Sequence, residues 1–71
     1  MELREFLAVA QEKSITKAAE YLYIAQPSLS KQMQNLEKEI GRPLFIRGSR
    51  AITLTETGQL LKTRAEELLD L

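Results

Sequence analysis

The residues from Pro27 to Gly41 restrict the fold more than any other part of the chain. Pro27 suits a first helical turn because its missing N–H costs little there, and Gly41 suits a C-terminal stop. Between them the apolar residues recur at the spacing of an amphipathic helix, at Leu29, Met33, Leu36 and Ile40. The sequence therefore predicts a helix over about Pro27 to Ile40 with one buried face.

Two shorter helices are predicted before this one. The first covers about Met1 to Lys13, because one face carries the apolar residues Leu3, Phe6, Leu7 and Ala10. Thr16 is the expected N-cap of the second, since its hydroxyl can accept from an orphan backbone N–H. This helix covers about Lys17 to Tyr23, and its predicted inward residues are Ala18, Ala19 and Leu22.

A β-hairpin and a fourth helix are predicted after Gly41. Residues 44–47 and 50–54 are β-prone and flank a Gly48–Ser49 turn, which is typical of a hairpin. An isolated hairpin is marginal in water, so we expect it to pack on the helices through Leu44, Ile46, Ile52 and Leu54. Thr55 is the predicted N-cap of a helix from about 55 to the end, where no C-cap follows. We therefore expect the chain to be a domain of a longer protein.

Length and residue content exclude several classes of protein. A chain of 71 residues is one small domain, and without cysteine or histidine it offers neither a disulfide nor an ordinary zinc site. The chain has no phosphate-binding glycine loop and no acid pair beyond solvated helix charges, so we expect no enzyme, no metal and no cofactor. No stretch has the layout of a membrane span or a signal peptide, so the expected location is cytoplasmic.

Positive charge is concentrated in the middle of the chain. The net charge is zero, which counts mildly against nucleic-acid binding. Residues 40–55, however, contain three arginines and no acid, namely Arg42, Arg47 and Arg50. Salt confines charge effects to roughly 8–10 Å, so a local basic patch can still attract DNA.

The outward face of the predicted 27–40 helix has the chemistry of a DNA-reading surface. Opposite the apolar stripe it carries no acid, and its residues are Pro27, Lys31, Gln34 and Lys38, flanked by Ser28, Ser30 and Asn35. Lysine can donate to guanine or phosphate, and glutamine and asparagine can bond adenine edges. Arg47 and Arg50 on the hairpin suit phosphate contact or minor-groove insertion. Ordinary solvated surface is the alternative interpretation of both features.

The chain also resembles the DNA-binding domain of the LysR-type transcriptional regulators along essentially its whole length. The matching segments are residues 14–19 (SITKAA), 26–33 (QPSLSKQM), 36–37 (LE) and 54–58 (LTETG), with Gly41, Leu44, Phe45, Arg47 and Arg50 in register. The resemblance implies a mainly α winged helix-turn-helix fold: a three-helix core, a two-stranded β wing and a long C-terminal linker helix. It further implies a bacterial DNA-binding domain over residues 1–54 and a linker and dimerisation helix over 55–71.

The resemblance also implies roles for particular residues. The expected base contacts are Gln26, Pro27, Ser28, Ser30, Lys31 and, in the minor groove, Arg50. Gln34 and Arg47 are the expected backbone contacts. In this family a small-molecule effector binds a further C-terminal domain, which these residues do not include.

Three positions depart from the family pattern. Lys31 stands where arginine is more common, and lysine is less suited than arginine to bidentate hydrogen bonding with guanine. Ala25 replaces a usual serine or threonine and removes a capping hydroxyl, at a cost of roughly 1 kcal/mol. Thr57 replaces a common alanine, with little expected consequence.

The last helix carries more apolar surface than one side of a small domain needs. We therefore expect a homodimer that pairs two recognition helices on a pseudo-palindrome, joined through Leu60, Leu61, Ala65, Leu68 and Leu69. The alternative is that all five pack on the first helix. The competing function, which would explain the zero net charge, is a winged-helix module that binds another protein.

Overall fold

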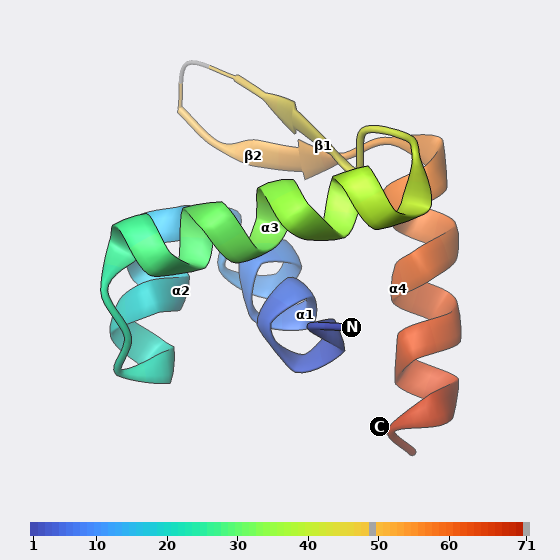
Figure 1. Cartoon of the computed structure of the whole chain (residues 1–71), viewed down its shortest axis with the longest axis horizontal. Coiled ribbons are helices and arrows are strands. Elements are labelled where there is room, and N and C mark those ends of the chain that lie inside the picture. The colour runs from blue at the N-terminus through green and yellow to red at the C-terminus, as the bar shows by residue number, and fades with distance from the viewer. Residues whose placement is uncertain (49, 71) are drawn as a thin grey trace.

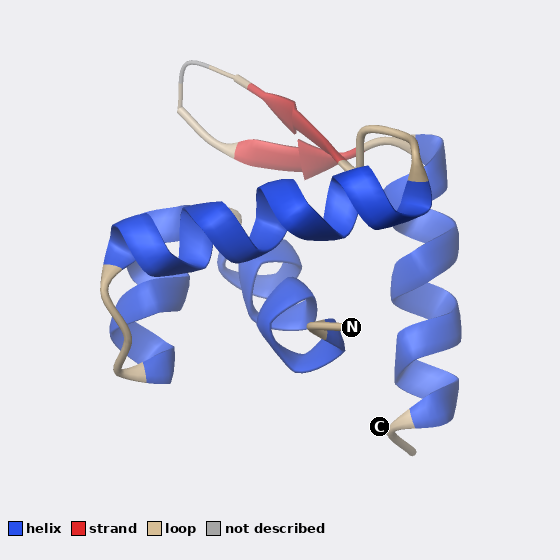
Figure 2. Ribbon diagram, in the orientation of Figure 1, coloured by secondary structure: helices blue, strands red, loops and turns tan. Residues whose placement is uncertain are grey.

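A computed structural model describes residues 1–48 and 50–70 of the chain. Four helices and one hairpin follow in the predicted order, as a mainly α winged helix-turn-helix (Figure 1 and Figure 2). The elements are α1 (Leu3–Glu12), α2 (Ile15–Leu22), α3 (Gln26–Ile40), β1 (Phe45–Arg47), β2 (Ile52–Leu54) and α4 (Glu56–Leu68). The Ser49 half of the predicted turn and the last predicted helical residue, Leu71, lie outside the described residues.

The ends of α3 are formed as its sequence predicts. Ala25 is its N-cap and makes no side-chain capping bond, while proline occupies the first turn. Gly41 ends the helix with a φ of 82°, and its N–H donates to the carbonyl oxygen of Glu37. This left-handed conformation costs glycine least, because glycine has no Cβ.

The start of α2 corrects the predicted N-cap. The Ser14 hydroxyl, not that of Thr16, accepts a hydrogen bond from the Lys17 N–H at 3.1 Å. Ser14 has extended backbone, with φ −160° and ψ 130°, which turns its side chain toward the open end of the helix. Thr16 is already inside the first turn and is exposed.

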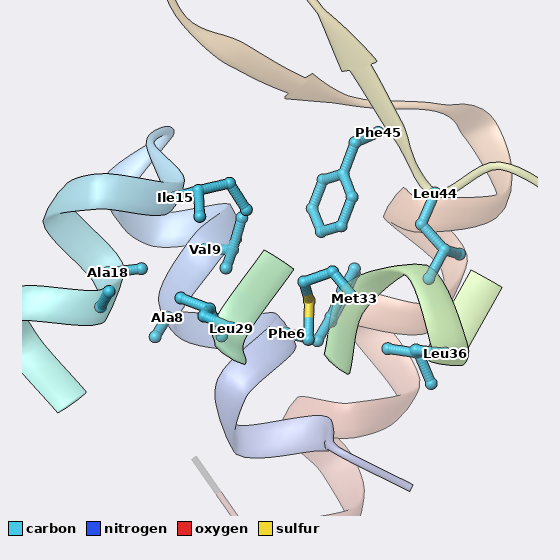
Figure 3. Packing of buried hydrophobic residues seen from close by; sticks show 11 residues of the cluster. Phe6, Ala8, Val9, Ile15, Ala18, Leu29, Met33, Leu36, Leu44 and Phe45 are labelled. Atoms are coloured by element: carbon cyan, nitrogen blue, oxygen red, sulfur yellow. The ribbon is translucent and has the colours of Figure 1, made fainter. Parts of the chain in front are cut away.

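One core lies between α1, α2, α3 and the beginning of the hairpin (Figure 3). Its largest fully buried side chains are Phe6, Val9, Leu29, Met33, Leu36 and Leu44. Ile40, Leu22 and Leu7 pack against this cluster at its edge. The predicted inward residues of α2 and α3 are confirmed, but the buried Ile15 of α2 and the buried Ala8 and Val9 of α1 were missed.

The hairpin corrects a second prediction. The strands pair antiparallel with Phe45 opposite Leu54 and Arg47 opposite Ile52. Phe45 is buried, with its ring centroid 5.4 Å from that of Phe6, whereas Ile46 is 55% exposed. Because strand side chains alternate between faces, burial of Phe45 turns Ile46 outward. Ile46 is therefore not the core residue that the sequence analysis predicted.

Helix α4 leaves the hairpin through a tight hydrogen-bonded corner. The Thr55 hydroxyl accepts from the Gly58 N–H at 3.0 Å, as predicted for an N-cap, and donates to the Pro43 carbonyl at 2.8 Å. Further along, Ala65 is fully buried within the chain and Leu61 packs against the core. No helix in the described residues is long and apolar enough to span a membrane.

Candidate nucleic-acid interface

The outward face of α3 is open to solvent. Pro27, Ser28, Lys31 and Gln34 are exposed, as is Gln26 at the first turn, and Ser30 is half-buried. They face outward because the stripe on the opposite side of α3 is fixed in the core by Leu29, Met33 and Leu36. Figure 1 shows α3 lying in front of α1, with the hairpin projecting beyond α3.

A shallow cleft joins one end of α3 to the hairpin. We call it the junction cleft; its lining includes Lys13, Gln26, Arg47 and Arg50, together with the N-cap and first residue of α2. Arg47 and Arg50 are both exposed. The tertiary structure thus brings the predicted base contact Gln26 beside the two predicted wing arginines, which lie 21 and 24 positions later in the sequence.

Positive charge dominates the junction cleft. Among the described residues that line it, three are cationic, namely Lys13, Arg47 and Arg50, and none is acidic. Within the part of the chain that the structure describes, the ion pairs lie in α4, between Lys62 and Glu66 at 3.3 Å and between Arg64 and Glu67 at 2.9 Å. The cations of the cleft are therefore available to an anionic partner.

Lys13 lines the junction cleft, although the sequence analysis did not single it out. It ends α1 in the left-handed conformation with a φ of 57°, and its carbonyl oxygen accepts from the Ile52 N–H at 3.0 Å. This bond attaches β2 to the end of α1 and brings the lysine beside the wing. No local sequence signal identifies such a contact, since it depends on a strand 39 positions later.

The predicted dimerisation residues divide into two groups. Leu60 and Leu68 are 58% and 75% exposed, and Leu69 is half-buried. Ala65 is fully buried in its own chain, which removes it from any surface that a partner could touch, and the half-buried Leu61 packs against the core of its own chain. The small side chain of Ala65 lets α4 approach the rest of the protomer, so the apolar surface left for a partner is that of Leu60, Leu68 and part of Leu69.

The polar side chains of this surface belong to a few chemical kinds. No three histidine, cysteine, aspartate or glutamate side chains gather into a group that could hold a metal ion within residues 1–48 and 50–70. The polar groups of the interface are amides, hydroxyls, lysines and arginines, which are suited to hydrogen bonding and to charge neutralisation.

Comparison with known sequences gives a consistent result. Residues 1–59 match the family described as bacterial regulatory helix-turn-helix proteins, lysR family. The chain is 50% identical over 68 residues to a probable cat1 operon transcriptional activator of Acinetobacter lwoffii. The match covers 96% of this chain and 22% of that protein, so the chain spans about a fifth of the length of this relative.

Two solved protein–DNA complexes have the same fold. The DNA-binding domain of BenM in complex with catB site 1 DNA superposes with a TM-score of 0.91 at 51% identity, covering 99% of this chain and 81% of that one. The DNA-binding domain of CbnR in complex with DNA has a TM-score of 0.89 at 37% identity, covering 99% and 84%.

Proposed function

Since this chain belongs to the lysR family of bacterial regulatory helix-turn-helix proteins, we propose that it places α3 in the DNA major groove and the wing arginines at the adjacent minor groove. It is a LysR-type helix-turn-helix DNA-binding domain, and its family functions in the regulation of transcription. The proposed docking mode rests on one observation. The outward face of α3, which bears no acid, adjoins the cationic junction cleft at Gln26.

The proposed contacts follow from the exposed groups and their chemistry. Gln26, Pro27, Ser28, Ser30 and Lys31 occupy the first half of α3, the part that normally approaches base edges in helix-turn-helix proteins. Glutamine suits adenine and lysine suits guanine, while the short side chains of serine permit close approach of the helix. These five are the proposed base contacts.

Charged groups at the edges of this surface suit the DNA backbone and the minor groove. Arg50 lies in the bend between the strands, at the far end of the wing, and is the proposed minor-groove contact because narrow A·T-rich grooves attract arginine. Gln34 and Arg47 are the proposed phosphate contacts, and Lys13 joins them because it shares the junction cleft with Arg47.

We propose that the chain acts as a homodimer through the outer face of α4. The exposed side chains of Leu60 and Leu68 are the apolar groups that support this proposal, and two chains related by a two-fold axis would read a pseudo-palindrome in successive major grooves. Effector binding, which the family resemblance implies for the whole regulator, is proposed for a region outside these 71 residues.

The experiment that tests base reading begins with duplexes selected from a random pool by the unaltered chain. Lys31→Ala should weaken binding to the selected duplex by roughly 1–3 kcal/mol and relax the preference at one position. Arg4→Ala, an exposed cation on α1 that does not line the junction cleft, is the matched control and should leave binding unchanged. Equal losses on selected and scrambled duplexes would make Lys31 a phosphate contact instead. Failure to retard any duplex at low salt would favour a protein-binding module.

A further inference from the structure

Glu37 connects the recognition helix to the wing. It lies in the last turn of α3, and its Oε2 accepts from the backbone N–H of Leu44 at 2.7 Å and from that of Phe45 at 3.4 Å. Within residues 1–48 and 50–70, these are the side-chain hydrogen bonds that join α3 to the base of β1. The half-buried carboxylate thus contacts the segment from which the wing emerges.

The same segment is held from its other side by the start of α4. The Thr55 N–H donates to the Leu44 carbonyl at 3.0 Å, and the Thr55 hydroxyl donates to the Pro43 carbonyl. Leu44 and Phe45 point into the core, toward the side chains of α1 and α3 (Figure 3). Residues 43–45 are therefore fixed by three elements, and Glu37 supplies the polar attachment to α3.

A carboxylate at this position is electrostatically unfavourable in two respects. The last turn of a helix carries partial negative charge, which disfavours an acid there. The same helix is proposed to meet DNA, whose phosphates also repel a carboxylate. The two backbone N–H donors offset these costs, since hydrogen bonds to an ionised acceptor are stronger than neutral ones.

We propose that Glu37 is a positioning residue that sets the angle between α3 and the wing, so that Lys31 and Arg50 reach adjacent grooves of the same duplex. This inference rests on the proposed function. Glu37 itself touches no DNA in this proposal; it acts through the backbone of Leu44 and Phe45.

The test separates geometry from charge by comparing three variants on a selected duplex with A·T-rich flanks. Glu37→Ala removes both the charge and the acceptor, whereas Glu37→Gln removes the charge and keeps an oxygen that can accept. Glu39→Ala removes an exposed acid two positions away that makes no side-chain hydrogen bond in the described residues. Loss of negative charge alone should leave binding equal or tighter, so Glu37→Gln and Glu39→Ala should not weaken it. Glu37→Ala should weaken binding about threefold or more and lose the flank preference, as expected for positions that act together.

Combination with Arg50→Ala gives the decisive readout. In the Arg50→Ala background, Glu37→Ala should lower the DNA affinity less than about twofold, because Glu37 acts on binding only through the wing. The inference would be overturned if Glu37→Ala lowered DNA affinity equally with and without Arg50, or if Glu37→Gln bound DNA as weakly as Glu37→Ala.

Circular dichroism identifies any variant that does not fold. If Glu37→Ala does not fold, Glu37→Asp replaces it, because aspartate keeps the charge but is too short to reach as far, and the same outcome is expected. If neither Lys31→Ala nor Arg50→Ala affects binding, the proposed function fails, which is a distinguishable result.

Discussion

Substitution of Gly58 by alanine tests how tightly α4 is held against the hairpin. On helix propensity alone, this change in the first turn of α4 should stabilise the protein by about 0.5–1 kcal/mol. The structure predicts the opposite sign. A methyl carbon at Gly58 would lie 3.1 Å from the carbonyl carbon of Leu44 and 3.2 Å from Leu54 Cδ2, and closer still to the carbonyl oxygen of Leu44.

The expected cost follows from what has to move. The contacting atoms of Leu44 belong to the backbone, which cannot rotate aside as a flexible side chain can. Helix α4 must therefore move away from Leu44, and this strains the hydrogen bonds of Thr55 to Leu44 and Pro43. Overpacking costs about 1–3 kcal/mol, and each weakened hydrogen bond about 0.5–1.5 kcal/mol. The free energy of unfolding should therefore fall by about 2–4 kcal/mol. This is a large part of the total free energy of unfolding expected for a chain of this size, roughly 4–11 kcal/mol.

Thermal melting followed by helical circular dichroism measures this loss. The melting temperature of Gly58→Ala should fall by at least about 8 °C, with both proteins at one concentration because association also stabilises. Gly41→Ala is the matched control: its φ of 82° strains alanine, yet nothing lies within 4 Å of the added carbon. It should cost only about 1–2 kcal/mol. A Gly58→Ala protein that melts at or above the unaltered one would refute the steric reasoning.

Three further predictions concern the cap, the interface and the dimer. Ser14→Ala should lower the free energy of unfolding by about 0.5–2 kcal/mol in urea titrations, whereas Thr16→Ala should change it little because only Ser14 caps α2. Arg47→Ala should lower the slope of log affinity against log salt by about 1 if Arg47 meets a phosphate; an unchanged slope would place it off the DNA. Leu68→Asp should shift the sedimentation equilibrium toward monomer, since it puts a charge on the exposed face of α4, and an unaltered dimer population would argue for another interface.

The sequence alone predicted those features that depend on neighbouring residues. Helix α3 was predicted to within one residue, since Pro27, Gly41 and the apolar stripe act within the helix itself. Its outward face was equally determined, because the position of Leu29, Met33 and Leu36 in the core leaves the opposite side exposed. The order of helices and hairpin followed from the same local signals.

Only the tertiary structure decided features that depend on contacts or backbone conformation outside a single helix or strand. Ile46 and Phe45 are both apolar, and packing on Phe6 selects which of them enters the core. Ser14 and Thr16 are both capping residues, and the backbone conformation at the end of α1 decides between them. Lys13 lies beside the wing because its carbonyl accepts from Ile52, 39 positions later, and Glu37 contacts the base of the wing because the chain turns back after α3 to bring Leu44 and Phe45 to its carboxylate. Periodicity and propensity describe one segment at a time, whereas these choices depend on the free energy of packing several segments together.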